Sequence, residues 1–355
     1  MFFWQRVHFI DELQRHGVTI EIVNPLDSPS LEAAHEVLAN HIKSNSYDLL
    51  FVSAPLFITK EILDIAKEKG LPSLCFRPDN LLIPYIDKEI ASSFDLIWLT
   101  SRETEHLYKK WGANYFFSPY AANPYTFSPE YKATINKLCF IGTPYGSRSN
   151  LINTIVEGGV PIDVFCKKNQ GSFNAELFLP TYKIPCMSAM EIFMNNIRFH
   201  EGRKVMYANL KNRFLKHTLK DSSGNLSLLP KVPFESLNGI YSNYSLSLSS
   251  TSARNTDILS KPVPVVNLRS FEIPMAGGLQ FCRFNEELAN YFEEDKEIVF
   301  YRENEELISK SLFYTNPQND HVSLQIKQAA RKRAVTDHTW INRFNEAFKI
   351  LGLKY

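Results

Sequence analysis

Residues 94–112, FDLIWLTSRETEHLYKKWG, place an apolar run directly before an amphipathic segment that ends in glycine. The run predicts a buried strand, and the segment predicts a helix closed by Gly112 at its C-cap. The same order recurs at 48–70, DLLFVSA followed by ITKEILDIAKEKG, and PSLCF (72–76) supplies another strand. Short apolar strands that alternate with helices indicate a parallel sheet covered on both faces. The first part of the chain is therefore expected to be α/β.

The start of the chain departs from this order. VTIEIV (18–23) predicts a strand and residues 30–44 predict a helix, but residues 6–16 already have a helical pattern. Only five residues precede that pattern, which is too few for a strand and a glycine loop. We therefore expect a helix at 6–16, and either a first domain without its usual opening strand or a natural product that starts earlier.

A second α/β series follows a connector without periodicity, which places the domain boundary near residues 128–136. The predicted elements are listed in chain order: strand LCFIG (138–142), helix 148–157, strand IDVFC (162–166), strand YSLSLS (244–249), a helix around Phe271, strand GLQFC (278–282), helix NEELANYFEE (285–294) and strand EIVFY (297–301). We expect domains at 1–130 and 131–330, a helical insertion at about 187–220 in the second, and a C-terminal helix at 331–355 that returns to the first.

Composition excludes several classes of protein. The formal net charge of +1 gives no electrostatic signal for nucleic acid. No apolar run approaches the roughly 20 residues of a membrane span, and the first residues do not resemble a signal peptide. The five cysteines have no CxxC spacing, which disfavours a disulfide framework and a zinc site. We expect a cytoplasmic protein without a bound metal or other cofactor.

The string CFIGTPYGSRSNLI (139–152) combines a strand, a glycine loop and a helix start. Such a junction exposes backbone N–H groups and the positive end of the helix dipole, which suits a phosphate, with Arg148 as its cationic partner. The alternative is an ordinary strand–helix turn. The string NLRSFEIPMAGGLQF (267–281) puts Glu272 in the first turn of a short helix, where a carboxylate can accept hydrogen bonds from a ribose diol, and Arg269 can face a diphosphate. A surface Arg–Glu pair is the alternative there.

The insertion is rich in basic residues, with seven Lys or Arg and two acids from Arg198 to Asp221. Apolar residues interleave with them, as in a helix that lies on an anionic membrane. A helix packed on its own domain with a solvated basic face is the other interpretation.

RSFEIPMAGG, the strand and helix that follow it, ENEEL and HTWINRF together resemble the CgeB-like group of glycosyltransferases. PDN (78–80), FDLIWLTSRETEHLYKKWG, YAANPYTFSP and FIGTPYGSR resemble that family's connecting segments in the same order. The resemblance covers most of residues 71–150 and 231–345. It implies the GT-B fold, in which two Rossmann-like domains with parallel sheets face each other across a cleft.

The resemblance also implies site residues. Glu272 matches the glutamate expected to hold the nucleotide ribose, Arg269 and Arg148 match basic positions near the donor diphosphate, and Gly142 matches a glycine that lets the backbone approach it. Lys231-Val232-Pro233 matches the segment that borders the base. The expected donor-binding set is Gly142, Thr143, Arg148, Val232, Asn267, Arg269, Phe271, Glu272 and Gly277. One departure is that Pro264 stands where many related retaining enzymes have a second glutamate, so Asn267 is the candidate sugar contact.

For the acceptor side, Asp79 and Asn80 follow a predicted strand and are expected to project into the cleft. Asp79 is a candidate general base, although Pro-Asp-Asn is also common in turns. Asn123 is a second cleft-lining candidate.

These residues lead us to expect a metal-independent glycosyltransferase, hexosyltransferase-like, in polysaccharide or glycoconjugate synthesis. It would move a sugar from a nucleotide-diphosphate sugar to a glycan, lipid-linked or protein acceptor. Two alternatives stay open. One is a non-catalytic protein that keeps the fold for glycan binding or assembly, and the other is a nucleotide-sugar epimerase.

Overall fold

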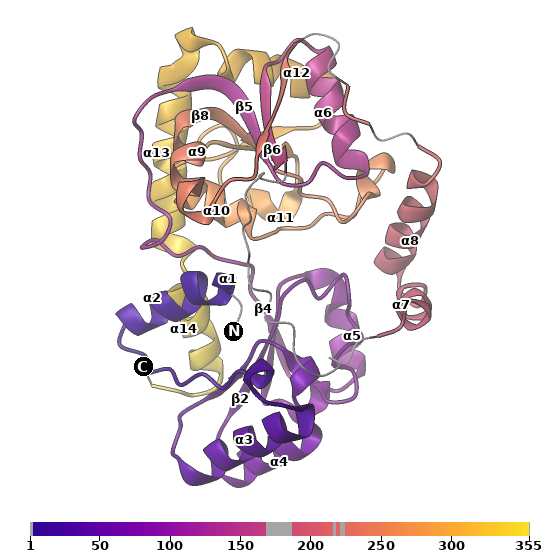
Figure 1. Cartoon of the computed structure of the whole chain (residues 1–355), viewed down its shortest axis with the longest axis vertical. Coiled ribbons are helices and arrows are strands. Elements are labelled where there is room, and N and C mark those ends of the chain that lie inside the picture. Colours follow the sequence, from indigo (N-terminus) through magenta and orange to yellow (C-terminus); the bar gives the residue numbers. More distant parts are fainter. Residues whose placement is uncertain (1–2, 168–186, 216–217, 221–223, 355) are drawn as a thin grey trace. The chain divides into compact units, whose positions relative to one another are not determined.

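The computed structural model describes residues 3–167, 187–215, 218–220 and 224–354 (Figure 1). Its strands form a four-stranded sheet in the order β1-β2-β3-β4 and a six-stranded sheet in the order β10-β9-β8-β5-β6-β7. Every pairing between these strands is parallel. The chain divides into two compact units, with unit 1 comprising Met1–Pro119, Asn174–Arg203 and Trp340–Tyr355, and unit 2 comprising Tyr120–Phe173 and Lys204–Thr339. The α/β class with two parallel sheets is confirmed.

Unit 1 contains the four-stranded sheet and the helices that connect its strands. Its strands are β1 (Leu50–Val52), β2 (Ser73–Arg77), β3 (Leu96–Leu99) and β4 (Tyr115–Phe117). Its helices are α1 (Phe3–Gln5), α2 (Asp11–Arg15), α3 (Leu31–Ser44), α4 (Lys60–Glu68), α5 (Glu105–Lys110), α7 (Ala189–Asn196) and α14 (Trp340–Ile350). In register, Leu50 lies beside Ser73, Leu74 beside Leu96 and Ile97 beside Tyr115. The predicted strands at β1, β2 and β3 and the helices at α3, α4 and α5 are therefore correct.

The helix expected at 6–16 is confirmed, because α1, a π-helical turn at Arg6–Ile10 and α2 follow one another without a break. The strand predicted at 18–23 is wrong, since these residues form no regular structure. A strand needs a neighbour to satisfy its backbone N–H and C=O groups, and alternating apolar residues alone do not provide one. Ile22 accordingly stays 45% exposed.

Aromatic side chains pack the π-helical turn at Arg6–Ile10 and α14 against the sheet of unit 1. The Phe9 ring lies 5.5 Å from both Phe51 and Trp340, and the Trp98 ring lies 5.2 Å from Phe344. Glu12 Oε1 accepts a hydrogen bond of 2.8 Å from the backbone N–H of Ile341, at the start of α14. The first and last helices of the chain are thus tied together within one core.

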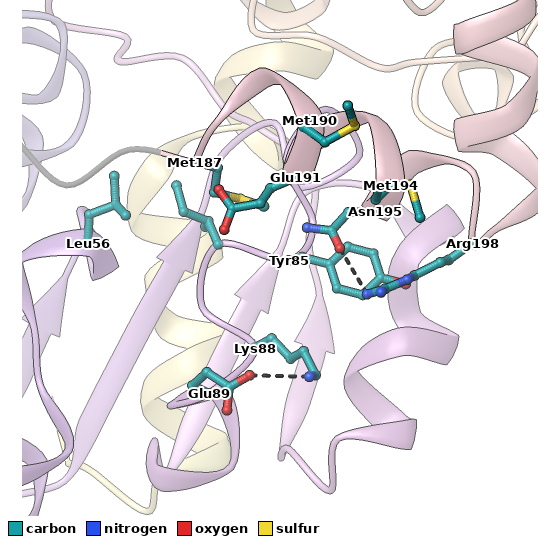
Figure 2. Close-up of a pocket in the computed structure, with 11 residues that line it drawn as sticks. Leu56, Tyr85, Lys88, Glu89, Met187, Met190, Glu191, Met194, Asn195 and Arg198 are labelled. Carbon is teal, nitrogen blue, oxygen red and sulfur yellow. Dashed lines mark hydrogen bonds and ion pairs between the residues drawn. The ribbon is translucent and has the colours of Figure 1, made fainter.

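A pocket of about 540 Å³ lies between α7 and the loop that follows β2 (Figure 2). Leu56, Tyr85, Ile86, Lys88 and Glu89 come from one side, and Met187, Met190, Glu191, Met194, Asn195 and Arg198 come from the other. A capping box between Ser188 and Glu191 starts α7. The first part of the expected insertion therefore packs with unit 1 and not with the second domain.

Unit 2 contains the six-stranded sheet. Its strands are β5 (Ile135–Ile141), β6 (Ile162–Lys167), β7 (Leu226–Pro230), β8 (Tyr244–Leu248), β9 (Gln280–Arg283) and β10 (Val299–Tyr301). Its helices are α6 (Ser147–Glu157), α9 (Leu237–Asn243), α10 (Arg269–Met275), α11 (Glu286–Ala289), α12 (Asn304–Tyr314) and α13 (Asp320–Asp337), and α8 (His200–Asn212) spans the division between the units. The predicted strands are confirmed, and β7 and α9 are additional elements.

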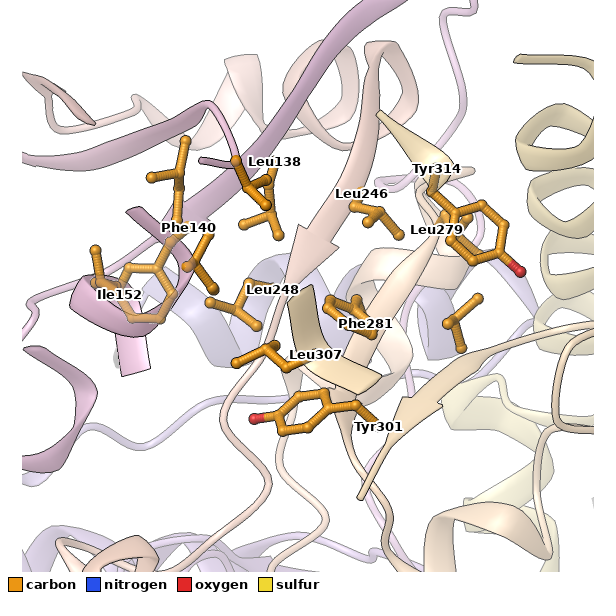
Figure 3. Packing of buried hydrophobic residues seen from close by; sticks show 14 of the residues in the cluster. Leu138, Phe140, Ile152, Leu246, Leu248, Leu279, Phe281, Tyr301, Leu307 and Tyr314 are labelled. Atoms are coloured by element: carbon orange, nitrogen blue, oxygen red, sulfur yellow. The ribbon is translucent and has the colours of Figure 1, made fainter. Parts of the chain in front are cut away.

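The core of unit 2 lies between this sheet and the helices α6, α12 and α13 (Figure 3). Leu138, Leu246 and Phe281 come from three neighbouring strands, and Ile152 and Leu307 come from the covering helices; all five are fully buried. β7 is the edge strand beside β6, with Leu226 opposite Ile162. Residues 226–229 of β7 are only partly buried, and no strand was predicted there.

The boundary between the units lies at Pro119/Tyr120, not at 130/131. The connector after it is part of the unit 2 core, since Ala121, Asn123 and Phe127 have exposures of 1% or less. The backbone N–H of Ala122 donates to the carbonyl of His338, and the Arg331 guanidinium donates to the carbonyls of Pro124 and Phe127. Proline and tyrosine in this connector made it look like a linker, whereas α13 anchors it.

Candidate functional site

The carboxyl edge of the unit 2 sheet contains a topological switch point. β5 and β8 are neighbours in the middle of the sheet, but the chain proceeds from β5 to β6 and β7 on one side and from β8 to β9 and β10 on the other. The loops that leave β5 and β8 therefore diverge. Ligands of open parallel sheets bind in the crevice that this divergence creates.

The loop after β5 brings its backbone against a guanidinium. Gly142 has a φ of +147°, and a Cβ there would lie 3.3 Å from Arg269 Nη1. Its N–H donates to the carbonyl of Phe165 on β6. Glycine is thus needed for the backbone conformation and for the close approach to Arg269.

Asn255 holds the start of α6, the helix that follows this loop. Its Oδ1 accepts a hydrogen bond of 3.3 Å from the backbone N–H of Ser147, and its Nδ2 donates to Asn209 Oδ1. Gly146, with a φ of +57°, precedes the helix, and a Cβ there would overlap Asn255 Oδ1. The positive end of α6 is therefore oriented by a contact that only glycine at position 146 permits.

The guanidiniums of Arg148 and Arg269 lie close enough beside the start of α6 for their charges to interact. The Arg148 guanidinium lies 4.6 Å from the centre of the Tyr145 ring, and that of exposed Arg254 lies 5.6 Å from it. Burial lowers the pKa of Arg148, and the like charge of Arg269 lowers it further. Burial also lowers the pKa of Arg269, but Tyr241 and Glu272 outweigh this effect and raise it. Carboxylates oppose this repulsion, since Asp257 raises the pKa of Arg148 and Glu272 raises that of Arg269. Two partly buried guanidiniums that repel each other favour an anion beside them.

Glu272 and Asn267 add hydrogen-bonding groups to this edge. Glu272 lies in the first turn of α10, one turn beyond Arg269, and is 8% exposed. Asn267 donates from Nδ2 to the carbonyl of Ser250 at 2.7 Å, whereas its buried Oδ1 accepts no hydrogen bond from the described residues. A carboxylate and an amide oxygen beside two arginines can bind a molecule with a diphosphate and hydroxyl groups.

The remaining predicted donor residues have different surroundings. Thr143 is exposed next to Gly142. Val232 follows β7 at the same sheet edge and packs on the cluster of Cys139, Phe165 and Tyr244. Gly277 has a φ of +73°, and a Cβ there would overlap Pro129 and Tyr131, so glycine lets the end of α10 lie against the connector.

Phe271 requires a correction. Its side chain has 0% exposure and its ring lies 5.3 Å from His338 and 6.1 Å from Phe292. It packs in the core behind α10 and does not line the site. The helical period explains why adjacent residues differ, since neighbouring side chains of a helix point in different directions.

The acceptor-side candidates lie in two different units. Asp79 follows β2 in unit 1; its side chain is exposed and its φ is +51°, in the left-handed region that Asp tolerates better than most residues. Asn123 belongs to unit 2, with 0% exposure, and its Oδ1 accepts a hydrogen bond of 2.9 Å from the N–H of Tyr125. The expectation that Asn123 lines a cleft is thus replaced by a role in the connector.

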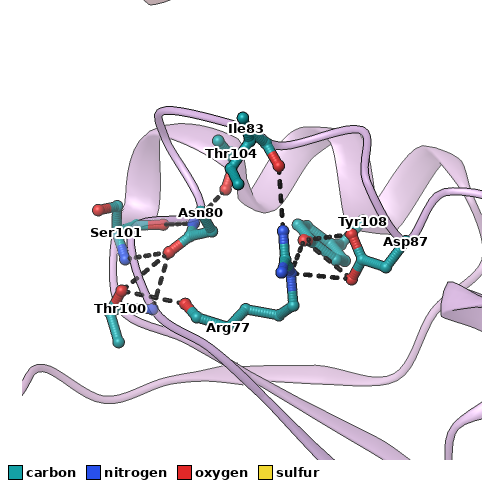
Figure 4. Close-up of polar contacts among 8 residues, drawn as sticks. All are labelled: Arg77, Asn80, Ile83, Asp87, Thr100, Ser101, Thr104 and Tyr108. Carbon is teal, nitrogen blue, oxygen red and sulfur yellow. Dashed lines mark hydrogen bonds and ion pairs between the residues drawn. The ribbon is translucent and has the colours of Figure 1, made fainter. Parts of the chain in front are cut away.

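Asn80 is fully buried and its amide organises the loop after β2 (Figure 4). Its Oδ1 accepts hydrogen bonds from the backbone N–H groups of Thr100 and Ser101, and its Nδ2 donates to Ser101 O and Thr104 Oγ1. These four bonds join the ends of β2 and β3. The Asn80 side chain therefore fixes the loop that carries Asp79, and it does not face a ligand itself.

A buried ion pair holds the other end of this loop. Arg77 Nε lies 3.1 Å from Asp87 Oδ2, and the Tyr108 hydroxyl donates to the Asp87 carboxylate (Figure 4). Arg77 also donates to the carbonyl of Ile83. Burial raises the pKa of Asp87, and the guanidinium of Arg77 opposes that rise. The network fixes the loop that carries Tyr85, Lys88 and Glu89 to the wall of the unit 1 pocket.

Sequence reasoning missed Asn255, Tyr145 and Tyr241. Tyr145 lies inside the motif 139–152, so its aromatic side chain could have been predicted to belong to the site. Asn255 is in the left-handed region at φ +63°, and no sequence pattern indicates that it caps a helix more than a hundred residues earlier.

The described residues contain no group of three or more His, Cys, Asp and Glu side chains placed to hold a metal ion. Within the same residues, no helix has the length and the apolar character to cross a bilayer. Cys75, Cys139, Cys166 and Cys282 are free thiols. Cys186, the fifth cysteine, and Lys216 and Asp221 of the basic segment 198–221 lie outside the described residues.

Comparison with known proteins agrees with this geometry. Residues 199–349 match the profile of a family described as "Glycosyl transferase-like". This segment contains α8 to α13 and most of α14, and therefore Arg269 and Glu272. No curated protein matches the sequence.

Solved structures show the fold of the whole chain. Sucrose-phosphate synthase from Thermosynechococcus elongatus is similar with a TM-score of 0.53 at 11% identity, over 94% of this chain and 81% of that one. Anabaena HepE, in complex with UDP and glucose, has a TM-score of 0.53 at 12% identity over 97% and 89%. A glycosyltransferase from Rickettsia africae has a TM-score of 0.53 at 12% identity over 96% and 87%. The chain has the GT-B fold.

Proposed function

We propose that this protein is a glycosyltransferase whose unit 2 binds a nucleotide-diphosphate sugar. The observation that carries the proposal is the pair Arg148 and Arg269, two partly buried guanidiniums whose charges repel each other and which lie beside Glu272 at the switch point of the sheet. The family profile over 199–349 supports a sugar transfer reaction. HepE structures that contain UDP and UDP-glucose support a uridine nucleotide as the first donor to test.

In the proposed reaction an acceptor hydroxyl attacks the anomeric carbon of the donor, and the bond to the nucleoside diphosphate breaks. Negative charge grows on the departing diphosphate, and the two guanidiniums and the start of α6 would stabilise it. Glu272 would hold the ribose and Asn267 the sugar, so that the anomeric carbon keeps a fixed position. Because Arg148, Arg269 and the start of α6 would supply this charge stabilisation, we propose that transfer needs no metal. The sugar that we propose is a hexose.

For the acceptor, we propose the unit 1 pocket of Figure 2 as the binding site, with Asp79 as the candidate base. The pocket offers the ring of Tyr85 together with Glu89, Glu191 and Asn195, and it fits the size range of small-molecule sites. We propose a glycan, lipid-linked or protein acceptor, a role in polysaccharide or glycoconjugate synthesis, and membership of the CgeB-like group. The free thiols fit a cytoplasmic enzyme.

The donor is tested by thermal unfolding of the protein with UDP, GDP, dTDP and CMP, followed by calorimetric titration. We expect UDP to raise the melting temperature most. Glu272→Gln should weaken the binding of that nucleotide by about 1.5–3 kcal/mol, because it removes a charged hydrogen-bond acceptor. Glu305→Gln, at an exposed position of α12, is the control and should leave the Kd unchanged. If Glu272→Gln binds as tightly as the parent, Glu272 does not hold the ribose.

Metal independence is tested by measuring sugar transfer or donor hydrolysis with EDTA present. We expect the rate to stay the same, because Arg148 and Arg269 neutralise the leaving group. A rate that falls with EDTA and returns with Mg²⁺ or Mn²⁺ would contradict this part of the proposal. Nucleotide binding without transfer or hydrolysis for any acceptor extract would favour the non-catalytic alternative.

A further inference from the structure

The pocket of unit 1 has an apolar wall that contains three methionines. This methionine wall consists of Met187, Met190 and Met194, and Leu56 and Ile86 line the pocket from the loops after β1 and β2 (Figure 2). Met190 is 69% exposed and Met194 42%, so the fold leaves a large part of both side chains in contact with water. Methionine side chains are flexible and polarizable, and they adapt to ligands of irregular shape. The methionine wall therefore suits an apolar chain.

The other face of the α7 segment is fixed within unit 1. Asn196, at the end of α7, is 6% exposed and Phe199, three residues later, is 3% exposed. The centre of the Phe199 ring lies 6.4 Å from that of His106 on α5. The methionine wall and the loops opposite it therefore belong to the same compact unit.

Most polar side chains of the pocket already have partners of their own. Glu191 accepts a hydrogen bond of 2.7 Å from the backbone at the start of α7, and Lys88 Nζ lies 3.2 Å from Glu89 Oε1. Asn195 Oδ1 accepts a hydrogen bond of 3.0 Å from the Arg198 guanidinium. A sugar held by its hydroxyl groups needs free donors and acceptors, and these contacts leave the pocket with fewer of them.

Arg198 is the cation of the pocket that forms no ion pair with a carboxylate of the described chain. Its guanidinium lies 5.9 Å from the centre of the Tyr85 ring. Burial raises the pKa of Tyr85, and the positive charges of Arg198 and Lys88 oppose that rise, so both cations act on this part of the pocket. Since Lys88 is paired, Arg198 is the group that can attract an anion beside Tyr85.

We propose that the unit 1 pocket binds an amphiphilic anion, whose apolar chain lies along the methionine wall and whose phosphate or similar head group pairs with Arg198. An apolar surface and one cation without an acidic partner are what the pocket leaves unsatisfied, and one such molecule covers both. The role of this ligand rests on the proposed function. As the acceptor it would be a sugar carried on a lipid phosphate, rather than a free glycan or a protein.

The test is calorimetric titration of the whole protein with decyl phosphate, below the concentration at which it forms micelles. Decyl maltoside has the same chain with a neutral head group, and inorganic phosphate has the charge without the chain. We expect decyl phosphate to bind with a Kd at least roughly fivefold lower than that of either, because it alone provides both the chain and the charge.

Two variants locate the ligand in the pocket. Arg198→Gln should weaken the binding of decyl phosphate roughly fivefold and leave that of decyl maltoside unchanged, because only the charged head group loses its partner. Met194→Ser should weaken the binding of both alkyl ligands roughly fivefold, since the chain loses apolar contact. The controls are Arg102→Gln, at an arginine paired with Glu105, and Val37→Ser on α3, where Val37 is 42% exposed as Met194 is. Both controls should bind like the parent.

Several results would overturn the proposal: no binding of decyl phosphate, equal binding of decyl maltoside, or the same loss in a variant and in its control. Sedimentation with phosphatidylglycerol vesicles without binding of decyl phosphate would assign the methionine wall to a membrane surface and would also overturn it. The melting temperature of each variant verifies that it is folded. UDP is titrated separately, so a protein that binds decyl phosphate but not UDP would contradict the donor site alone.

Discussion

At the scale of single residues, Arg148 and its position beside Arg269 are decisive for the proposed nucleotide binding. We expect Arg148→Met to weaken nucleotide-diphosphate binding by about 1.5–3 kcal/mol, the range for charged hydrogen bonds. The free energy of unfolding without ligand should stay the same or rise, because burial and the charge of Arg269 both oppose the cation. Calorimetric titration and thermal unfolding give the two values.

Arg333→Met on α13 is the control for Arg148→Met, since Arg333 is ion-paired with Glu297 and Asp337 outside the site. It should not change the Kd. A structural role for Arg148 predicts the opposite result from ours, with lower stability and unchanged nucleotide binding. The two quantities together therefore decide between a ligand-binding and a structural arginine.

Glu12 gives a second residue-scale prediction. Burial raises its pKa to about 7, and the hydrogen bonds from Ile341 and Trp340 at the start of α14 only partly oppose this effect. The folded state therefore holds a proton that the unfolded state has lost above pH 4.5, so this group makes unit 1 less stable as the pH rises from 4.5 to about 7. The free energy of unfolding falls by about 3 kcal/mol over this pH range.

The measurement is denaturant unfolding followed by tryptophan fluorescence, because Trp4, Trp98, Trp111 and Trp340 all belong to unit 1. Glu12→Gln should remove the decline between these pH values, whereas Glu36→Gln on the exposed face of α3 should keep it. Parallel pH profiles for Glu12→Gln and the parent would show that Glu12 is ionised in the folded protein throughout.

At the scale of elements, the start of α6 requires glycine at position 146. Gly146→Ala would put a methyl group into Asn255 Oδ1 and displace the cap of α6. We expect a loss of stability of roughly 2 kcal/mol or more and weaker nucleotide binding, because overlap and an unfavourable φ add together. Calorimetric unfolding and titration measure both.

Gly159→Ala is the matched control. Gly159 has a similar backbone, with φ at +79°, but a Cβ there meets no atom within 4 Å. It should show the backbone cost alone and leave nucleotide binding unchanged. If both variants lose the same stability and bind equally, the contact between Gly146 and Asn255 has no role in shaping the site.

The elements also show what the sequence predicted and why. Strands covered on both faces, such as β2 and β3, were predicted because burial forces a continuous apolar run. The edge strand β7 was missed and 18–23 was wrongly predicted, because strand formation depends on a hydrogen-bonding neighbour that local sequence does not reveal. One sheet edge brings together four residues whose motifs indicated their chemistry: Gly142, Arg148, Arg269 and Glu272. Phe271 and Asn80 were also predicted to line the binding site, but their side chains pack in the interior.

At the scale of the whole molecule, the two sheets with their orders and parallel pairings give the GT-B fold, although identity with the solved structures is only 11–12%. The division into units depends on contacts between residues far apart in the sequence, which the sequence alone could not reveal. The connector 120–127 joins unit 2 through α13, and α14 joins unit 1 through Glu12 and the aromatic cluster around Phe9. Residues 187–203 extend unit 1, where α7 forms the wall of a pocket.

We infer that unit 2 binds a nucleoside diphosphate at the carboxyl edge of its sheet. A crystal structure of the protein with UDP tests it most directly. We expect the diphosphate against the backbone of Gly142 and between the guanidiniums of Arg148 and Arg269, with the ribose on Glu272. UDP bound at any other place, or a site that stays empty at a concentration that raises the melting temperature, would contradict the claim.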